Sequence, residues 1–210
     1  MKIGIMGGTF DPIHNGHLML AEYAYRNYGL DEVWFLPNGN PPHKQNPAIQ
    51  KDTFERVEMT RLAISDVPYF KLCTYEAENQ NKSYTYRTLI HFREKYPQHA
   101  FYYIIGADSL CDIETWAHPE ILLGLAVILA AYRDDLDTPD EMNTRIQFLN
   151  EKYQADIRLL RTPLMDISSH EIREQIAKDE NWQSQVPLKV ASYIKTQGLY
   201  QGDDNGRRTE

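Results

Sequence analysis

Two glycines and two histidines near the N-terminus have the types and spacing needed to bind phosphate groups. The segment 3–17 reads Ile-Gly-Ile-Met-Gly-Gly-Thr-Phe-Asp-Pro-Ile-His-Asn-Gly-His. The adjacent Gly7 and Gly8 let the backbone approach a ligand closely and expose its N–H groups. His14 and His17 add donors at the entrance of a helix that we expect to begin near Asn15, where the helix dipole favours an anion. The pattern therefore predicts a pocket for a polyphosphate.

Other interpretations of this segment explain less of it. An ordinary tight turn accounts for the glycine pair but leaves the two histidines without a role. Gly4, Gly7 and Gly8 do not have the G-x-G-x-x-G spacing of a dinucleotide fingerprint, and the Walker A lysine is absent, so neither of those nucleotide-binding motifs is met. Two histidines three residues apart could ligate zinc, but no third Cys, His or acidic residue accompanies them closely. We therefore predict no metal site made by protein side chains.

Strand-like and helix-like segments alternate along the chain and would position these residues. We predict strands at 2–6, 32–36, 69–73, 101–105, 125–131 and 156–160, and helices at 15–28, 52–65, 83–95, 118–123, 139–152, 169–179 and 186–197. Such alternation is typical of an α/β fold, here a Rossmann-like, doubly wound parallel sheet with a small C-terminal helical subdomain. Ligands bind such sheets at the carboxyl ends of the strands, where the segments 7–8, 37–44 and 106–108 fall. Asp52, with Glu55 as its capping-box partner, and Ser83 are predicted helix N-caps.

The length of 210 residues suits one domain, which we place at 1–201, with 167–201 as its helical part. The polar residues 202–210 are expected to form a disordered tail. The formal net charge of −8 argues against sequence-independent binding to nucleic acid, which needs a basic face. No apolar run approaches transmembrane length and the N-terminus leads directly into a strand, so we expect no membrane association. Two widely separated cysteines, Cys73 and Cys111, favour a reducing, cytoplasmic environment.

Residues 7–17 resemble the signature of the nucleotidylyltransferases that carry a His-x-Gly-His motif. Further similarities run along almost the whole chain: Pro-Pro-His-Lys at 41–44, Ser-Tyr-Thr at 83–85, Ile-Gly-Ala-Asp-Ser-Leu at 105–110, Thr-Trp at 115–116, and Ile-Ser-Ser with Ile-Arg at 167–173. In this order they resemble the bacterial nicotinate-nucleotide adenylyltransferases, also called deamido-NAD pyrophosphorylases. The resemblance implies adenylyl transfer from ATP to nicotinate mononucleotide, which yields deamido-NAD and pyrophosphate in NAD biosynthesis.

The resemblance also implies an ATP site. Its residues are Gly7, Gly8, Thr9, Phe10, His14, His17, Gly106, Asp108, Ser168, Ser169 and Arg173. The catalytic residues among the matched positions are His14, His17, Lys44 and Arg173. A carboxylate at Asp108 suits the two ribose hydroxyls, and it could equally cap the following helix. Ser168 and Ser169 could likewise serve only as helix caps.

A phosphate nucleophile is already ionised at neutral pH, so the reaction needs no general base. It needs donors and cations that position and neutralise two polyanions, together with Mg²⁺ carried by ATP.

For the acceptor, the resemblance implies contacts from Lys44, Ser83, Tyr84, Thr85, Trp116 and Arg133. The indole of Trp116 would stack on the pyridine ring, although a buried core tryptophan is the usual alternative. The helix start near Thr85 would bind the pyridine carboxylate. The chain departs from the family at Arg87, where an Asp is common, at His170, where a Thr is usual, and after Arg133, where Asp134-Asp135 replaces Pro-Gly.

Two other functions remain open at this point. Another nucleotidylyltransferase of the same superfamily, such as one acting on phosphopantetheine, is disfavoured by Trp116, the 83–85 segment and the 41–44 loop. A non-catalytic nucleotide sensor is disfavoured because both histidines are intact. The expected partners are ATP and nicotinate mononucleotide, with no nucleic acid and no membrane, and the sequence leaves a homodimer possible.

Overall fold

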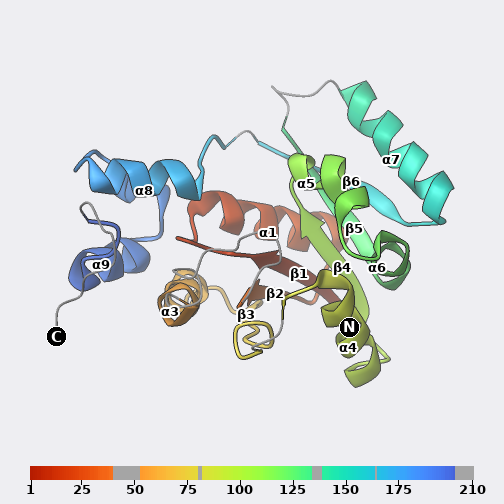
Figure 1. The fold of residues 1–210 in the computed structure, drawn as a ribbon, viewed down its shortest axis with the longest axis horizontal. Helices are drawn as coiled ribbons and strands as arrows, with labels where there is room; N and C mark the ends of the chain where they lie inside the picture. Colours follow the sequence, from red (N-terminus) through yellow and green to blue (C-terminus); the bar gives the residue numbers. More distant parts are fainter. Residues whose placement is uncertain (40–52, 80–81, 134–138, 164, 202–210) are drawn as a thin grey trace.

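A six-stranded parallel sheet lies at the centre of the described part of the chain (Figure 1). Its strands are β1 (Lys2–Gly8), β2 (Glu32–Pro37), β3 (Phe70–Leu72), β4 (Ala100–Ile105), β5 (Val127–Arg133) and β6 (Ile157–Thr162). They follow the order β3-β2-β1-β4-β5-β6, and every neighbouring pair is parallel. The predicted doubly wound α/β fold is thereby confirmed.

The computed structural model describes residues 1–39, 53–79, 82–133, 139–163 and 165–201. The predicted loop lysine Lys44, the predicted cap Asp52 and the predicted tail 202–210 lie outside the described residues. Within the described residues, no helix is both long enough and apolar enough to cross a membrane.

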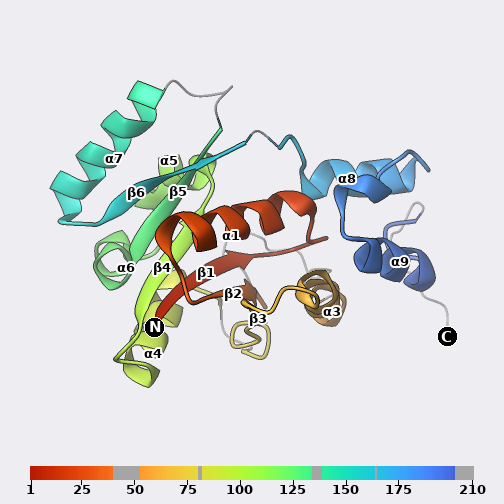
Figure 2. The same cartoon turned by 180° about the vertical axis from the view of Figure 1, so that it is seen from behind.

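Helices cover both faces of the sheet, as seen from opposite sides in Figures 1 and 2. One hydrophobic cluster packs one face against α1 (Asn15–Tyr28), α3 (Thr53–Ile64), α8 (Ser169–Ala177) and α9 (Leu188–Gln197). A second cluster packs the other face against α4 (Thr85–Lys95), α5 (Ala107–Asp112), α6 (Pro119–Leu125) and α7 (Pro139–Tyr153). Two short 3₁₀ helices, η1 (Ile113–Thr115) and η2 (Gln183–Gln185), join these elements.

Alternation along each strand explains the two clusters. In β4, Tyr103 faces the second cluster, whereas Tyr102 and Ile104 face the first. Successive side chains of a strand point to opposite faces, so a strand covered on both sides must be apolar throughout. This is why the central strands appear in the sequence as continuous apolar runs.

The strand order places a topological switch between β1 and β4, since the chain winds toward β3 on one side and toward β6 on the other. In such sheets the crevice at the carboxyl ends of the two central strands is the usual ligand site. Gly8 ends β1, and Gly106 follows β4 and is the N-cap of α5. The fold therefore brings the two predicted glycine segments to the same edge of the sheet.

Several predicted boundaries differ from the structure. Helix α4 begins at Thr85 with Tyr84 as its N-cap, so the prediction that Ser83 caps this helix is wrong. Helix α5 and η1 are missing from the predicted helices, because the segment 107–115 is too short to show a helical repeat of apolar residues. The alternative that Asp108 caps a following helix is wrong, because Gly106 is the N-cap of α5 and Asp108 lies within its first turn. Strands β5 and β6 each run two residues beyond their predicted ends, because backbone pairing continues there up to the pair Arg133–Thr162.

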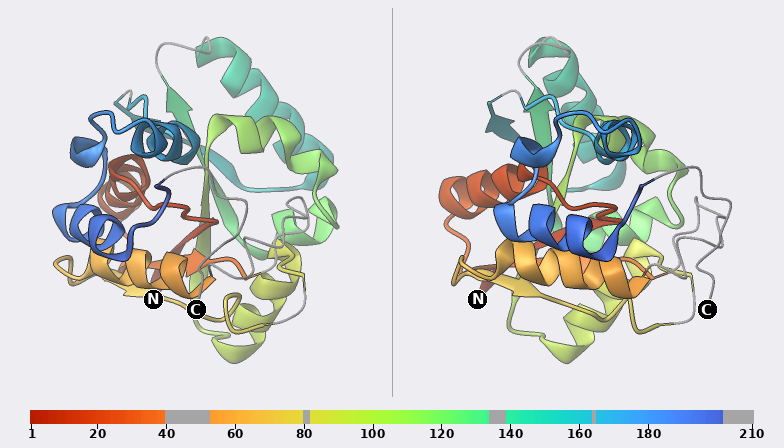
Figure 3. Two further views of the ribbon diagram at one scale, coloured as in Figure 1. Left: turned by 60° about the vertical axis from the view of Figure 1, so that its left-hand side comes forward. Right: turned by 90° about the vertical axis from the view of Figure 1, so that its left-hand side faces the viewer.

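The C-terminal helices pack into the first hydrophobic cluster. Helix α9 lies beside α3 in both views of Figure 3, and Tyr193 of α9 donates a hydrogen bond to Glu55 of α3 (2.6 Å). Helix α8 contributes Ile172 and Ile176 to the same cluster. These helices therefore complete the covering of one sheet face.

Candidate active site

Two adjoining cavities open at the carboxyl ends of β1 and β4. The first has a volume of about 230 Å³ and the second about 390 Å³. Gly7, Tyr103, Ser109 and Trp116 line both cavities, so these residues form their common boundary. A molecule in one cavity would meet a molecule in the other next to the backbone of Gly7.

The second cavity gathers phosphate-binding candidates from distant parts of the sequence. His14 and His17 come from the start of α1, Gly106 from the end of β4, and Ser168 and Ser169 from the start of α8. The N-termini of three helices, α1, α5 and α8, thus border one cavity. Helices α1 and α8 are the longer two, whereas α5 is a short helix. Their free N–H groups and dipoles favour an anion there.

The two histidines lie close together at the start of α1. Their ring centroids are 3.7 Å apart. The backbone N–H of His14 donates to Nδ1 of His17 at 3.3 Å. Because Nδ1 of His17 accepts a hydrogen bond, the neutral ring carries its proton on Nε2. His17 therefore offers an Nε2–H donor.

Burial lowers the pKa of His17 well below its usual value, and the neighbouring His14 lowers it further. Both effects disfavour the charged form, since a second positive charge would be close and water would be scarce. Without a bound anion the ring is therefore neutral at physiological pH. A bound anion would raise the pKa of His17, because it favours the charged ring.

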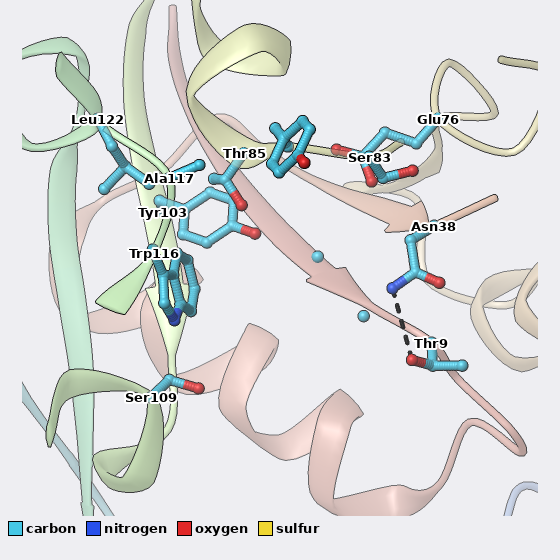
Figure 4. A pocket seen from close by; sticks show the side chains of 13 residues that line it. Thr9, Asn38, Glu76, Ser83, Thr85, Tyr103, Ser109, Trp116, Ala117 and Leu122 are labelled. Carbon is cyan, nitrogen blue, oxygen red and sulfur yellow. Dashed lines mark hydrogen bonds between the residues drawn. The ribbon is translucent and has the colours of Figure 1, made fainter. Parts of the chain in front are cut away.

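One side of the first cavity is aromatic. The rings of Trp116 and Tyr103 are perpendicular, with centroids 6.4 Å apart, and Trp116 is only partly buried (Figure 4). Trp116 therefore presents ring surface to both cavities instead of being a wholly enclosed core residue. Burial raises the pKa of Tyr103, so its hydroxyl keeps its proton.

The predicted segment 83–85 forms another side of this cavity, at the start of α4. A buried carboxyl group, Glu76, lies beside it and accepts a hydrogen bond from Thr88 at 2.6 Å. Burial raises the pKa of Glu76, which reduces its negative charge near neutral pH.

Thr9 and Asn38 lie across the first cavity from Trp116 (Figure 4). Asn38 donates its side-chain N–H to the hydroxyl of Thr9 (3.4 Å) and its backbone N–H to the carbonyl of Gly8 (3.0 Å). These bonds join the loop after β1 to the loop after β2. Asn38, Glu76 and Tyr103 were not predicted as site residues; Asn38 falls within the segment 37–44 that was predicted to lie at the carboxyl edge of the sheet, and the sequence carries no such signal for the other two.

Ser168 and Ser169 have both of the roles considered for them. The hydroxyl of Ser168 accepts from the backbone N–H of Glu171 (3.1 Å) and so caps α8, while Ser169 donates to the carbonyl of Pro12 (2.9 Å). Both residues also line the second cavity. Capping and exposure to the cavity are compatible at a helix start.

Three predicted ATP-site residues do not line either of these two cavities. Phe10 is buried and packs edge-on against His17, with ring centroids 5.0 Å apart. Asp108 is exposed in the first turn of α5.

Arg173 donates to the carbonyls of Asp11 (2.6 Å) and Ser169 (3.2 Å), and therefore fastens the loop before His14.

The remaining predicted residues divide as follows. Gly7, Gly8, Thr9, Ser83, Tyr84, Thr85 and Trp116 line the first cavity. Arg133 is the last residue of β5. In the described part of the chain, no group of three or more His, Cys, Asp or Glu side chains could hold a metal ion.

Comparisons with known proteins agree with this geometry. A cytidylyltransferase-like family model matches residues 5–175. The chain is 45% identical over 199 residues to a protein named "Probable nicotinate-nucleotide adenylyltransferase" from Lachnoclostridium phytofermentans, covering 95% of this chain and 98% of the relative. It is 39% identical over 202 residues to the nicotinate-nucleotide adenylyltransferase of Bacillus subtilis, again covering 95% and 98%.

The fold is also similar to a solved structure. Plasmodium falciparum nicotinic acid mononucleotide adenylyltransferase complexed with NaAD aligns with a TM-score of 0.74 and 23% identity. The alignment covers 95% of this chain and 97% of that chain. At this identity the similarity concerns the fold.

Proposed function

The chain belongs to the cytidylyltransferase-like family and, within it, to the nicotinate-nucleotide adenylyltransferases, and we propose that each of its two cavities binds one of the two substrates. The enzyme transfers the adenylyl group of ATP to nicotinate mononucleotide, giving deamido-NAD and pyrophosphate in NAD biosynthesis. The observation that carries the assignment of sites is the shared boundary of the two cavities at Gly7, Tyr103, Ser109 and Trp116. Two nucleotides bound on either side of that boundary would bring their phosphates together.

ATP binds in the second cavity in this proposal. The Nε2–H of His17, the ring of His14 and the start of α8 surround the position of the triphosphate. The larger volume, about 390 Å³, suits the larger substrate. Arg173 donates to the Asp11 carbonyl and keeps the loop before His14 in place.

Nicotinate mononucleotide binds in the first cavity. Its pyridine ring stacks on Trp116, and its carboxylate meets the N–H groups at the start of α4 near Thr85. The raised pKa of Glu76 lessens repulsion of that carboxylate. Its phosphate extends across the cavity toward Thr9 and Asn38, past the glycine pair at the end of β1, of which Gly7 also lines the second cavity.

The chemical step is an in-line displacement at the α-phosphorus of ATP. A phosphate oxygen of nicotinate mononucleotide forms a new bond to that phosphorus, while the bond to the bridging oxygen of the β-phosphate breaks and pyrophosphate leaves. Negative charge grows on the leaving group, and His17 donates its Nε2–H to the phosphate oxygens. A donor that is already in place stabilises this charge without reorganising at the moment of reaction.

Mg²⁺ is the metal that we propose to accompany ATP. The described residues offer no cluster of three or more ligating side chains, which fits an ion held mostly by phosphate oxygens and water. When bound, it neutralises phosphate charge. The residues of the second cavity then orient the phosphates with respect to the acceptor.

A pyrophosphate-release assay with ATP and a panel of acceptors tests the proposal. The panel contains nicotinate mononucleotide, its amide and phosphopantetheine, with an acceptor-free reaction as control. We expect release to be fastest with nicotinate mononucleotide and to produce deamido-NAD in equal amount. Faster release with phosphopantetheine would favour a related transferase, and no release with any acceptor would favour a nucleotide sensor.

A further inference from the structure

Arg56 lies in the core beneath the loops that line the first cavity. Its exposed fraction is 0%, and it belongs to the inner face of α3 together with Met59 and Ala63. An apolar residue would be the usual occupant of this position between a helix and a sheet. Burying a guanidinium group is unfavourable unless its donors are well paired, so its pairing indicates what it does there.

The guanidinium group joins two loops. Its Nη1 donates to the carbonyl of Thr9 (2.7 Å), and its Nη2 donates to the carbonyl of Asn38 (2.7 Å). A weaker contact reaches the side-chain oxygen of Asn38 (3.4 Å), and Thr53 at the start of α3 accepts from Nη2 (3.0 Å). Thr9 follows β1 and Asn38 follows β2, so one side chain fixes the spacing of the two loops.

Holding the Thr9 carbonyl also fixes the orientation of the next peptide group, because a peptide unit is planar. That next residue, Phe10, has a φ of 52°, a left-handed conformation that a bulky residue seldom adopts. The Phe10 ring packs edge-on against His17. The bond from Arg56 therefore supports a strained backbone position, while the Phe10 ring itself is also held in the core by its contact with Phe35.

We propose that Arg56 is a positioning residue for the acceptor nucleotide. It acts through Thr9 and Asn38, which it holds at the spacing that receives the phosphate of nicotinate mononucleotide. This inference rests on the proposed assignment of the first cavity to that substrate. Thr9 and Asn38 line the first cavity and not the second, so Arg56 affects the acceptor more than ATP.

The test compares Arg56→Lys and Arg56→Gln with the parent protein. Lysine keeps the positive charge but lacks the fork that can reach both carbonyls, whereas glutamine loses the charge as well. Arg61→Gln is the matched control, because Arg61 lies on the same helix, is exposed, and pairs with Glu58 in the preceding turn. For each variant we measure kcat, KM for each substrate and the thermal unfolding midpoint.

We expect Arg56→Lys to raise KM for nicotinate mononucleotide on the order of tenfold, since a hydrogen bond to a charged group is lost or weakened. KM for ATP should stay within about twofold, because the residues that Arg56 holds are not those lining the second cavity. Arg56→Gln should raise KM for the acceptor further, and Arg61→Gln should match the parent. If Arg56→Gln does not fold, Arg56→Lys decides the question alone.

The proposal is overturned if the two KM values rise together, or if only the unfolding midpoint falls while both KM values stay unchanged. Either result would make Arg56 a general structural residue. A failure of the proposed function looks different: the parent protein itself would then form no deamido-NAD. The parent assay therefore separates the two ideas.

Discussion

At the scale of single residues, His17 combines two properties that a phosphate-binding donor needs. Its Nδ1 is occupied by the backbone N–H of His14, which sets the tautomer, and its pKa is lowered by burial and by His14. The ring is therefore a neutral donor, and in the proposed ATP site nearby phosphate charge would make it more basic. The two properties lead to separate predictions for activity and for stability.

Replacing His17 by alanine should lower kcat by a factor on the order of 10² to 10³, since one preorganised donor to the developing charge is lost. The fold should persist, because His17 lines a cavity. Steady-state kinetics and circular dichroism check this. His170→Ala is the control, since that exposed side chain pairs with Glu174 and should leave kcat unchanged. A folded His17→Ala protein with parental kcat would remove His17 from catalysis.

The lowered pKa of His17 makes stability depend on pH. Below about pH 6.5 the unfolded chain binds a proton at this position that the folded chain does not bind, so the free energy of unfolding decreases as pH falls. Above that pH this contribution is constant. We would measure the free energy of unfolding by urea at several pH values between 5 and 8. Plotted against pH, this free energy should change less steeply for His17→Asn than for the parent protein. Equal slopes would show that the folded ring titrates normally.

Trp116→Ala should raise KM for nicotinate mononucleotide about tenfold or more and change KM for ATP little, because stacking on a flat ring is worth roughly 1–3 kcal/mol. Trp116→Phe keeps an aromatic face, so its KM for nicotinate mononucleotide should lie between the values of the parent protein and of Trp116→Ala. Steady-state kinetics with each substrate varied in turn provides the measurement. A parallel rise in both KM values would identify Trp116 as a residue that supports the whole boundary between the cavities.

At the scale of elements, the helix starts beside the two cavities are the proposed anion sites, and we expect side chains near them to set the selectivity. Thr85 begins α4 beside the first cavity. Arg87, two residues further along, turns away: its Nε donates to the hydroxyl of Tyr86 (2.9 Å) and its guanidinium group lies over the rings of Tyr84 and Tyr86. The departure from the family at position 87 is thus accommodated on the exposed side of the helix.

The parent protein should therefore prefer nicotinate mononucleotide to its amide, and Arg87→Asp should change that preference by no more than about twofold. The acid offers a carboxylate to N–H donors, whereas the amide would present donors to donors. The ratio of kcat/KM for acid and amide, measured in both proteins, checks this. A ratio near one in the parent would contradict the acceptor assignment, and a large change in Arg87→Asp would show that the arginine reaches the substrate.

At the scale of the whole molecule, the C-terminal helices close the core and fasten the loop before His14. Ser169 and Arg173 donate to the carbonyls of Pro12 and Asp11, and Tyr200 donates to the carboxylate of Asp11 (2.6 Å). Residues more than 150 positions apart thus hold one loop. Site geometry and core stability therefore depend on the same segment.

A chain ending at residue 167 should lose cooperative unfolding, because it lacks the buried side chains of α8 and α9 that cover one sheet face. Removing several large buried side chains costs far more than the usual stability of a domain. A chain ending at Gln201 keeps every described residue and should unfold at the parental temperature. Differential scanning calorimetry of both truncations checks this, and a cooperative transition in the shorter one would contradict it.

The sequence by itself determined the fold class, the family and where the glycines that we predict to bind an anion lie. The apolar runs and the amphipathic repeats are local patterns, and helix and strand preferences act over a few residues. The order of the motifs then fixed which strand ends carry chemistry, since parallel strands share one carboxyl edge. The sheet order and the comparisons confirm the fold class and the family, whereas the anion-binding role of the glycines stays a prediction.

Only the tertiary structure decided which side chains meet at that edge. The pairing of Arg56 with the carbonyls of Thr9 and Asn38 links three elements, and nothing in the sequence around Arg56 distinguishes it from a surface arginine. The attachment of Arg173 to Asp11 spans 162 residues. Local preferences cannot encode such contacts, because they depend on the spacing of elements that is set when the two faces of the sheet are packed.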